Sequence, residues 1–543
     1  MLIRILYTLL PLRLHQWYSL LYYRIIRRFW PFRLPPVNGF IFENRRFDFQ
    51  KYMPSPWHGN NEFTFLNVKG KVRWDKFEPI PEQAMLWQYN LHYLDELWAC
   101  NSSNDISSQR DLILAWWEAN KEVLGVPWDP YPTSLRAVNL CKWLWLNPGQ
   151  IDSCKAGTIL GRHYIEIRRK LEIHLQANHL FANLKALWFI QAALPEVRSR
   201  DWQWLIAKIK AQISEQFDDC GGHFELSPMY HRIMLWDLMD MLELASDVID
   251  FSVLKPILED KIRKGLRWAI ALSHSDGEIA LFNDGALGGA PSLNSLICYA
   301  SKLGVAEPQF KDGSYSGYLV TRKNIATLIC DAAPVGPAFQ PGHAHADSLS
   351  FELSLGLSRV VVNSGTSVYE LTPERLYQRS TAAHNTVVVD GKNSSDVWSS
   401  FRVGRKARAS IIRQVIKEGF AEFEASHDGY RGCMHRRLWR LSDDRLTIRD
   451  SLNGKFCEAS AFFHFHPEVK INILDRDAIC VCGGDFKMKV FFCGAENLEV
   501  RIKDGFWYPK FGEMKANKFA EVTWSSGALS TEFSWEVIRE GQL

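Results

Sequence analysis

Apolar residues recur at helical spacing from about residue 80 to residue 305. Trp87, Leu91, Leu94 and Trp98 fall on one side of a helix, because residues three or four positions apart share a helix face. Several such helices with short connectors predict a helical toroid or an array of helical hairpins, and no fixed-period repeat indicates a solenoid. The expected helices cover residues 158–173, 178–193, 202–217, 229–249, 254–273 and 291–303.

The pattern changes to alternation after residues 304–317. The segments beyond this point carry apolar residues at every second position, which is typical of strands with one buried face. Their number, with turn signals such as Asp390-Gly391, predicts an antiparallel β-sandwich. The predicted organisation is therefore a toroid over residues 80–305 followed by a sandwich over residues 316–543.

The first 79 residues carry different signals. Residues 1–35 contain six arginines and no acidic residue, among many aliphatic and aromatic residues. No apolar run approaches the roughly 20 residues that span a bilayer, and we expect no cleavable signal peptide. This basic amphipathic segment predicts either peripheral contact with an anionic membrane or a basic helix docked on the protein's own body. Residues 36–79, with several Pro, Gly and Asn, predict an irregular or short-stranded connector.

Composition narrows the class of protein. The chain has 543 residues, 47% of them hydrophobic and 23% charged, which predicts folded domains rather than disorder. A net charge of +3 gives no general case for binding nucleic acid. The 11 cysteines are scattered without a Cys-x-x-Cys pair, which indicates no disulfide framework. The 21 tryptophans are compatible both with stacking on sugar rings and with an aromatic helical core.

The motif Pro-Gly-His-Ala-His-Ala-Asp at residues 341–347 carries the most chemistry. If this segment is extended, His343, His345 and Asp347 lie on one face of a strand. Two imidazoles and a carboxylate on one edge hold a metal, move protons or neutralise an anionic substrate. The alternative is a surface strand whose histidines are only solvated.

Five further motifs accompany this one, in a fixed order along the chain. They are Leu-Trp-Gln-Tyr-Asn-Leu-His-Tyr at 86–93, Tyr-Pro-Thr-Ser-Leu-Arg at 131–136, Asn-His-Leu at 178–180, Met-Tyr-His at 229–231 and Arg-Ser-Thr-Ala-Ala-His-Asn-Thr-Val at 379–387. Together the six motifs resemble the heparinase II/III-like family of polysaccharide lyases. The resemblance implies an (α/α) toroid followed by an antiparallel β-sandwich, with the active cleft between them.

The resemblance also implies an eliminative cleavage. Such a lyase removes the C5 proton of a uronic acid and breaks the bond at C4, so the neighbouring carboxylate must be neutralised as charge develops. The resemblance assigns Asn178 and His179 to that carboxylate, and Tyr230 and His343 to catalysis. Because an unperturbed tyrosine has a pKa of about 10, nearby cations would have to lower it for Tyr230 to act as a base. The structural alternatives are a polar patch at residues 178–179 and a rim aromatic at Tyr230.

The loop between residues 363 and 384 supplies further candidates by the same resemblance. A loop tyrosine is expected as the second proton-transfer group; we give this place to Tyr369, although spacing alone does not separate it from Tyr377. Arg379, His231 and Tyr377 are the candidate substrate contacts.

A metal site is a further expectation from the resemblance. In related lyases a zinc-like ion is bound by positions that correspond here to His345, Asn363 and His384. An amide is a poorer zinc ligand than an anionic oxygen. The three possibilities are weak zinc binding, use of another ligand such as His464, and a metal-free histidine network.

The resulting hypothesis is a bacterial lyase that cleaves a uronate-containing glycan, linked to exopolysaccharide or cell-envelope metabolism. The expected location is the envelope or periplasm, with association to the cytoplasmic membrane as the alternative. One rival is a toroid glycosidase, which needs two carboxylates flanking one bond; Glu225, Asp237 and Asp284 are the candidates. The other rival is a non-catalytic glycan-binding or assembly protein, made plausible by the amide at Asn363.

Overall fold

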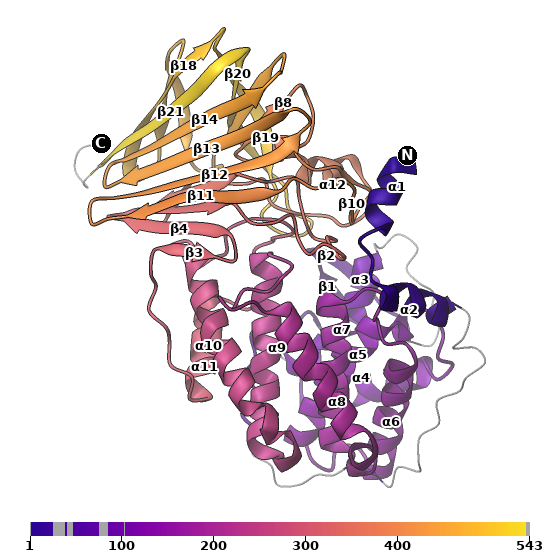
Figure 1. The fold of residues 1–543 in the computed structure, drawn as a ribbon. Coiled ribbons are helices and arrows are strands. Elements are labelled where there is room, and N and C mark those ends of the chain that lie inside the picture. The colour runs from indigo at the N-terminus through magenta and orange to yellow at the C-terminus, as the bar shows by residue number, and fades with distance from the viewer. Residues whose placement is uncertain (1, 25–38, 41–46, 75–84, 102–103, 539–543) are drawn as a thin grey trace.

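The computed structural model describes residues 2–24, 39–40, 47–74, 85–101 and 104–538. Helices form the first part of the chain and antiparallel sheets the second (Figure 1), so the predicted fold class is confirmed. The expectations for residues 1, 25–38, 41–46, 75–84, 102–103 and 539–543 lie outside the described residues.

Helices with visible start signals build the toroid. Pro130 and Pro228 begin two of them, where the missing N–H of proline costs nothing. Asp105 and Asp152 cap two others by accepting a backbone N–H in the first turn. Their apolar faces meet in one core that includes Trp143 and many other large side chains. The helices are α3 (Met85–Leu91), α4 (Ile106–Ala119), α5 (Pro130–Leu146), α6 (Ser153–Arg169), α7 (Ala177–Ala193), α8 (Pro195–Gln216), α9 (Pro228–Asp247), α10 (Lys255–Ala271) and α11 (Leu293–Lys302).

An eight-stranded antiparallel sheet forms one layer of the sandwich, in the order β11-β12-β13-β14-β21-β18-β17-β16. Burial alternates with period two along β13 and β18, as the sequence pattern predicts for strands with one face in the core. The strands are β11 (Ala409–Ile416), β12 (Phe420–Tyr430), β13 (Cys433–Ser442), β14 (Arg445–Gly454), β16 (Lys470–Asp475), β17 (Ala478–Cys482), β18 (Phe486–Glu496) and β21 (Ser526–Val537).

Two smaller sheets form the second layer. One has the order β3-β4-β5-β6-β7 and the other β19-β20-β15-β8, and a bridge between Val361 and Phe465 joins them side by side. The five-stranded sheet is buried on both faces, because α10 covers the face that does not contact the eight-stranded sheet. The strands are β3 (Gly313–Tyr315), β4 (Tyr318–Lys323), β5 (Ala326–Asp331), β6 (Phe351–Leu355), β7 (Ser358–Val361), β8 (Val387–Val389), β15 (Ala459–His464), β19 (Glu499–Trp507) and β20 (Lys515–Trp524).

Short elements complete the structure. Helices α1 (Leu2–Leu9) and α2 (Leu14–Arg24) lie along one side of the molecule, with α1 beside the sandwich half and α2 beside the toroid (Figure 1). Within the connector, β1 (Glu62–Phe65) and β2 (Val68–Lys71) form a hairpin. Helix α12 (Pro373–Gln378) and the pair β9 (Val397–Trp398) and β10 (Arg402–Val403) lie between β7 and β11 in the sequence. No helix in the described ranges is long and apolar enough to cross a membrane.

The motif at residues 341–347 is not a strand, which corrects the sequence prediction. These residues form turns and bends, and the following strand β6 begins only at Phe351, after Leu349 with a φ of 61°. The three polar side chains therefore do not share a strand face. His343 and His345 both contact Asp284, whereas the Asp347 carboxylate accepts the backbone N–H of Asn283.

Candidate active site

The candidate site lies where the N-terminal ends of α7 and α9 meet the loops of the sandwich half. Asn178 and His179 stand in the first turn of α7, after Gln176 and Ala177, which both have positive φ. Non-glycine residues in that region cost free energy, and such strain is concentrated at functional sites. The strained entry to α7 therefore supports a functional role for this helix end.

Ser227 joins the start of α9 to the sandwich side. Its hydroxyl oxygen accepts the backbone N–H of Tyr230, and its hydroxyl donates to the carbonyl of Asp284 at 2.7 Å. One capping residue thus fixes both Tyr230 and the segment that carries Asp284.

Tyr230 belongs to an aromatic group whose five rings come from separate parts of the chain. Its hydroxyl lies 2.9 Å from the hydroxyl of Tyr369, and its ring lies 4.0 Å from the ring of His343, centroid to centroid. Phe401 and Phe511 contact the Tyr369 ring edge-on. Burial raises the pKa of both tyrosines, and their mutual contact and Asp284 raise that of Tyr230 further. Tyr230 therefore keeps its phenolic proton at neutral pH. Its surroundings raise the pKa, whereas a role as base would require neighbouring cations to lower it.

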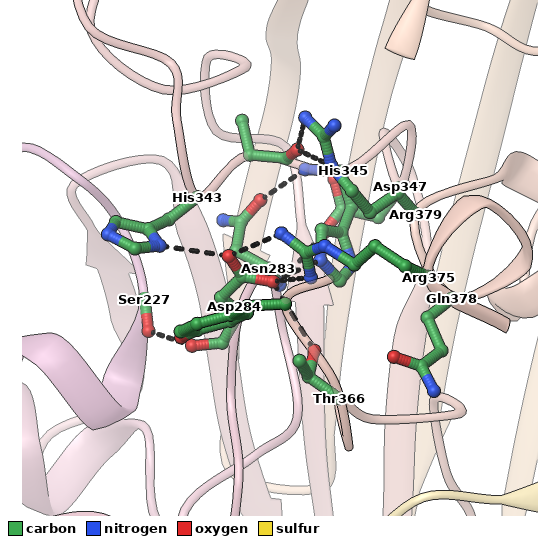
Figure 2. Close-up of polar contacts among 12 residues, drawn as sticks. Ser227, Asn283, Asp284, His343, His345, Asp347, Thr366, Arg375, Gln378 and Arg379 are labelled. Carbon is green, nitrogen blue, oxygen red and sulfur yellow. Dashed lines mark hydrogen bonds and ion pairs between the residues drawn. The ribbon is translucent and has the colours of Figure 1, made fainter. Parts of the chain in front are cut away.

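Asp284 is the hub of a buried cluster, shown in Figure 2, that we call the Asp284 cluster: Asp284, His343, His345 and Arg375. The carboxylate accepts from His343 Nδ1 at 2.8 Å, from His345 Nε2 at 2.9 Å and from both terminal nitrogens of Arg375. Burial alone would raise the pKa of Asp284, but Arg375 and the two histidines hold it well below the usual value. Asp284 is thus an ion at neutral pH.

An ionised Asp284 determines the orientation and tautomer of His343. Because the carboxylate only accepts, His343 presents Nδ1–H to it, and Nε2 carries the lone pair. Among the described residues, His343 Nε2 makes no hydrogen bond; the carboxylate of Glu225 lies 3.7 Å away. The backbone N–H of Asp284 also donates to the His343 carbonyl at 3.0 Å. The cluster therefore holds a proton acceptor in place beside Tyr230.

His179 is the candidate for positive charge on the toroid side. Its Nδ1 lies 3.0 Å from the Glu172 carboxylate, which Asn183 also binds. Burial lowers the pKa of His179, but the Glu172 carboxylate outweighs that effect and the net pKa is raised. About 30% of the His179 side chain is exposed, so an anionic ligand can reach this imidazole, whose protonated form Glu172 favours.

Glu225 links the two sides of the site. It is buried, it interacts with both His343 and His179, and it accepts the backbone N–H of Asn178. Burial raises the pKa of its carboxyl group. The two imidazoles that the resemblance assigns to different steps are therefore close to one carboxyl group.

Three candidate substrate contacts are not presented to a ligand as expected. His231 is fully buried, with Nε2 on the Gly265 carbonyl and Nδ1 on the backbone N–H of His223. Arg379 is fully buried and donates to the carbonyls of Ala344, Trp398, Ser399 and Arg402. Tyr377 is half-buried, and within the described residues its hydroxyl forms no hydrogen bond with Tyr230 or His343. The donors of His231 and Arg379 are thus used within the protein, which corrects the sequence expectation for these two residues.

The expected metal ligands come together only in part. His345 Nδ1 lies 3.2 Å from His384 Nε2, and burial lowers the pKa of His384 to about 3 and that of His345 to about 4. The Asn363 amide oxygen already accepts from Asn385, and His464 Nε2 bonds to the Ala382 carbonyl. Across the described ranges, no three His, Cys, Asp or Glu side chains are grouped as metal ligands. Two neutral imidazoles without an anionic third ligand do not fit a tight zinc site.

The glycosidase alternative lacks a free carboxylate pair. Asp284 is committed to Arg375 and two histidines, and Asp237 is bound to Lys185 inside the toroid. Glu225 is left as a single acid, whereas glycoside hydrolysis needs two carboxyl groups on one bond.

Sequence reasoning missed Arg375, Glu172 and the role of Asp284. Arg375 precedes the Arg379 motif by one helical turn, and Asp284 stands in an ordinary Asn-Asp-Gly sequence that resembles a turn. The one available signal was the polar pair Asn283-Asp284 within an otherwise apolar stretch from Ile279 to Leu287.

The fold is a helical toroid joined to an antiparallel β-sandwich, and tyrosines and histidines gather between the two halves. These features place the protein in the class of toroid-and-sandwich proteins. Family models agree: "Heparinase II/III N-terminus" matches residues 166–302, and "Heparinase II/III-like, C-terminal" matches residues 306–536. The chain belongs to the heparinase II/III-like family.

Similar proteins agree with this assignment. A heparin-sulfate lyase from Bacteroides stercoris is 27% identical over 366 residues, which are 61% of this chain and 52% of the relative. The chain thus spans about half the length of that curated relative. A heparinase III structure superposes with a TM-score of 0.69 at 14% identity, covering 86% of this chain and 80% of that one. A heparan sulfate lyase from Pedobacter heparinus gives 0.61 at 15% identity, covering 89% and 82%. At these identities the structures show the shared fold.

Proposed function

We propose that this protein is a polysaccharide lyase that cleaves a uronate-containing glycan by β-elimination. The observation that carries the proposal is the contact of Tyr230 with both Tyr369 and His343, with Glu225 reaching from His343 to His179. The proton-transfer groups and the carboxylate-binding candidates Asn178 and His179 then lie on either side of Glu225, an arrangement suited to β-elimination. The lyase activity of the B. stercoris relative supports the same conclusion.

The proposal gives each group a role that is compatible with its contacts. The His179 cation and Asn178 bind the uronate carboxylate, which withdraws charge from C5. His343 Nε2 takes the C5 proton, because Asp284 keeps its lone pair directed away from the cluster. The C5 electron pair then forms the C4–C5 double bond as the C4–O bond breaks. A phenol of the Tyr230–Tyr369 pair gives its proton to the leaving oxygen.

This assignment differs from the expectation that Tyr230 is the base. Burial raises the pKa of Tyr230 well above its usual value, and a phenol that keeps its proton is suited to donate it to the leaving oxygen in the transition state. His343 is the group whose acceptor nitrogen is left without a hydrogen bond in the described structure.

Zinc enters the proposal only as a weakly bound ligand. His345 and His384 would hold it, with Asn363 or His464 as the third residue, and it would supply positive charge behind the site. The steps above use the chain's own residues and do not pass through the metal.

The proposal extends to partners and location. The substrate is an anionic polysaccharide, and the cell envelope or periplasm of a bacterium is where such glycans are made and remodelled; association with the cytoplasmic membrane is the alternative. Fractionation of cells that carry the tagged protein distinguishes these locations.

The decisive experiment is an ultraviolet absorbance assay with a panel of uronate polysaccharides. Elimination creates a conjugated double bond, so absorbance should rise with at least one substrate. Release of new reducing ends without that absorbance would show a hydrolase instead. Retention of glycan with neither signal would show a non-catalytic binding protein.

A further inference from the structure

Helix α2 has the reverse of the usual polarity of a surface helix, and the neighbouring helix α1 also leaves large apolar side chains exposed. In α2, Gln16 and Ser19 are buried, at 0% and 5% exposure, although both are polar. The large apolar side chains of the same segment point to solvent, with exposures from 44% to 89%. We call six of them the N-terminal apolar face: Leu6, Leu10, Leu14, Trp17, Tyr18 and Leu21.

Polar contacts attach both helices to the body of the protein. Arg4 forms an ion pair with Asp396 at 2.9 Å, and Thr8 accepts the indole N–H of Trp398. Arg13 pairs with Glu215 on α8. The Gln16 amide donates to the His174 carbonyl at 3.2 Å. The helices are therefore docked on both halves of the molecule, in agreement with one of the two alternatives from the sequence. Among the described residues, no side chain covers their exposed apolar side chains.

An uncovered apolar face of this size calls for an occupant, since soluble proteins keep large apolar side chains scattered. The charge of the segment indicates which occupant. The first 42 residues contain six arginines and no acidic residue, and the side chains of Arg4 and Arg13 are 55% and 40% exposed despite their ion pairs. Apolar side chains flanked by cations fit the boundary between acyl chains and anionic headgroups.

We propose that the N-terminal apolar face docks on an anionic lipid bilayer surface. The six side chains enter the acyl boundary, and the neighbouring arginines contact the headgroups. Docking through polar contacts to the body leaves the face rigidly oriented with respect to the rest of the protein.

The position of the face gives docking a consequence for the site. The segment from Asp396 to Val403, which α1 contacts, also supplies Phe401 beside Tyr369 and the Ser400 carbonyl that Arg375 binds. Figure 1 shows α1 next to β10 and α12, at the side of the junction between the two halves. A docked molecule would thus hold the candidate site close to the membrane.

The test uses the full chain and four substitutions on the face: Leu6→Ser, Leu10→Ser, Leu14→Ser and Leu21→Ser. A matched control replaces four aliphatic side chains elsewhere whose exposures, from 63% to 82%, lie within the range of the face residues: Leu124→Ser, Ile249→Ser, Val253→Ser and Leu357→Ser. Each protein is mixed with phosphatidylglycerol–phosphatidylcholine vesicles or with phosphatidylcholine vesicles, and the sedimented fraction is measured.

The parent should bind the anionic vesicles, weakly bind the neutral ones, and lose binding as salt shortens the Debye length to about 3 Å at 1 M. The face variant should bind at least tenfold more weakly with an unchanged melting temperature, and the control should stay within about twofold of the parent. A parent that does not sediment with anionic vesicles, or a face variant that binds as the parent does, would overturn the proposal. It would also fail if the parent were a dimer that ignored vesicles and the face variant a monomer, because a second copy would then cover the face. The measurement is independent of lyase activity.

Discussion

Two buried networks in this protein use the same three side-chain types for different ends. In the Asp284 cluster an aspartate accepts from Arg375 and two histidines; inside the sandwich, Asp450 accepts from Arg437 at 2.7 and 3.0 Å and from His435 at 2.6 Å. Both carboxylates are fully buried, and arginine and histidine lower the pKa of both against the effect of burial.

The difference lies in the outer nitrogen of each histidine. His435 Nδ1 bonds to His427 Nε2, and His427 Nδ1 accepts the Gly429 N–H, so each ring nitrogen has a partner. His343 Nε2 has no hydrogen bond in the described structure, and 11% of its side chain is exposed. An Arg–Asp–His arrangement is thus structural when every ring nitrogen of its histidine has a hydrogen-bond partner. It is suited to catalysis when it orients a ring nitrogen that has none.

The largest expected effect separates the two aspartates directly. Asp284→Asn and Asp450→Asn should each cost about 3–5 kcal/mol of unfolding free energy, because each leaves a buried arginine unpaired. Only Asp284→Asn should also lower kcat, on the order of 10³-fold or more with little change in KM, since His343 then loses its fixed tautomer. Urea unfolding and kinetics of the folded fraction measure both. Equal kcat in the two variants would contradict the claim that Asp284, unlike Asp450, serves catalysis.

Tyr230→Phe tests the open side of the Asp284 cluster without disturbing its charge. The ring and its packing on His343 stay, while the hydroxyl that contacts Tyr369 is lost. We expect elimination to fall about 10²-fold or more, the scale of acid–base catalysis, with an unchanged melting temperature. Near-full turnover on a substrate that the parent cleaves would exclude Tyr230 from proton transfer. Tyr377→Phe, in the same loop region as Tyr369, tests the alternative that Tyr377 is the second proton-transfer group; if it is not, this variant should keep nearly full turnover.

His231 sharpens the comparison because it follows Tyr230 directly, yet both of its ring nitrogens have hydrogen-bond partners, as those of His435 do. Burial lowers its pKa to about 4, whereas the unfolded chain has a value of about 6.5. Between these two pH values the unfolded chain binds a proton that the folded protein does not. The contribution of His231 to the free energy of unfolding is therefore full above pH 6.5. It falls by about 3 kcal/mol in all as the pH drops toward 4.

The measurement is the unfolding free energy of the parent and of His231→Gln at several pH values between 7 and 4. Between pH 6.5 and 4, the unfolding free energy of the variant should depend less steeply on pH than that of the parent, by about 1.4 kcal/mol per pH unit for the one proton lost. Identical slopes would mean that His231 titrates normally in the folded protein.

The smallest expected effect concerns zinc. Asn363→Asp restores an anionic oxygen beside His345 and His384, so the variant should gain zinc-dependent stability of about 1.4 kcal/mol at a tenfold excess over Kd, while the parent holds little metal. Metal content and melting temperature with and without zinc measure this. Stoichiometric zinc in the chelator-dialysed parent would contradict the weak-site prediction. A variant that gains neither metal nor stability would point to a metal-free histidine network.

The origin of each network explains what sequence reasoning reached. Arg437 and Asp450 face each other across the β13–β14 pair, so a hairpin prediction alone brings them together. Asp284, His343 and Arg375 come from three segments of the chain: Asp284 is 59 positions from His343, and His343 is 32 positions from Arg375. No periodicity relates these positions. For the same reason the expectation of one strand face for His343, His345 and Asp347 was wrong, while a functional role for the motif stays a prediction.

By itself the sequence determined the fold class, because the helical period before residue 304 and the alternating period after residue 317 are local properties of the chain. It also determined the family, through motifs that are short and contiguous. The tertiary structure alone decided that Asp284 orients His343, that Arg379 and His231 are committed to backbone groups, and that α1 and α2 turn their apolar side chains outward. Those are outcomes of which surfaces meet when distant segments pack, and packing over such distances leaves no periodic trace in the residues that take part.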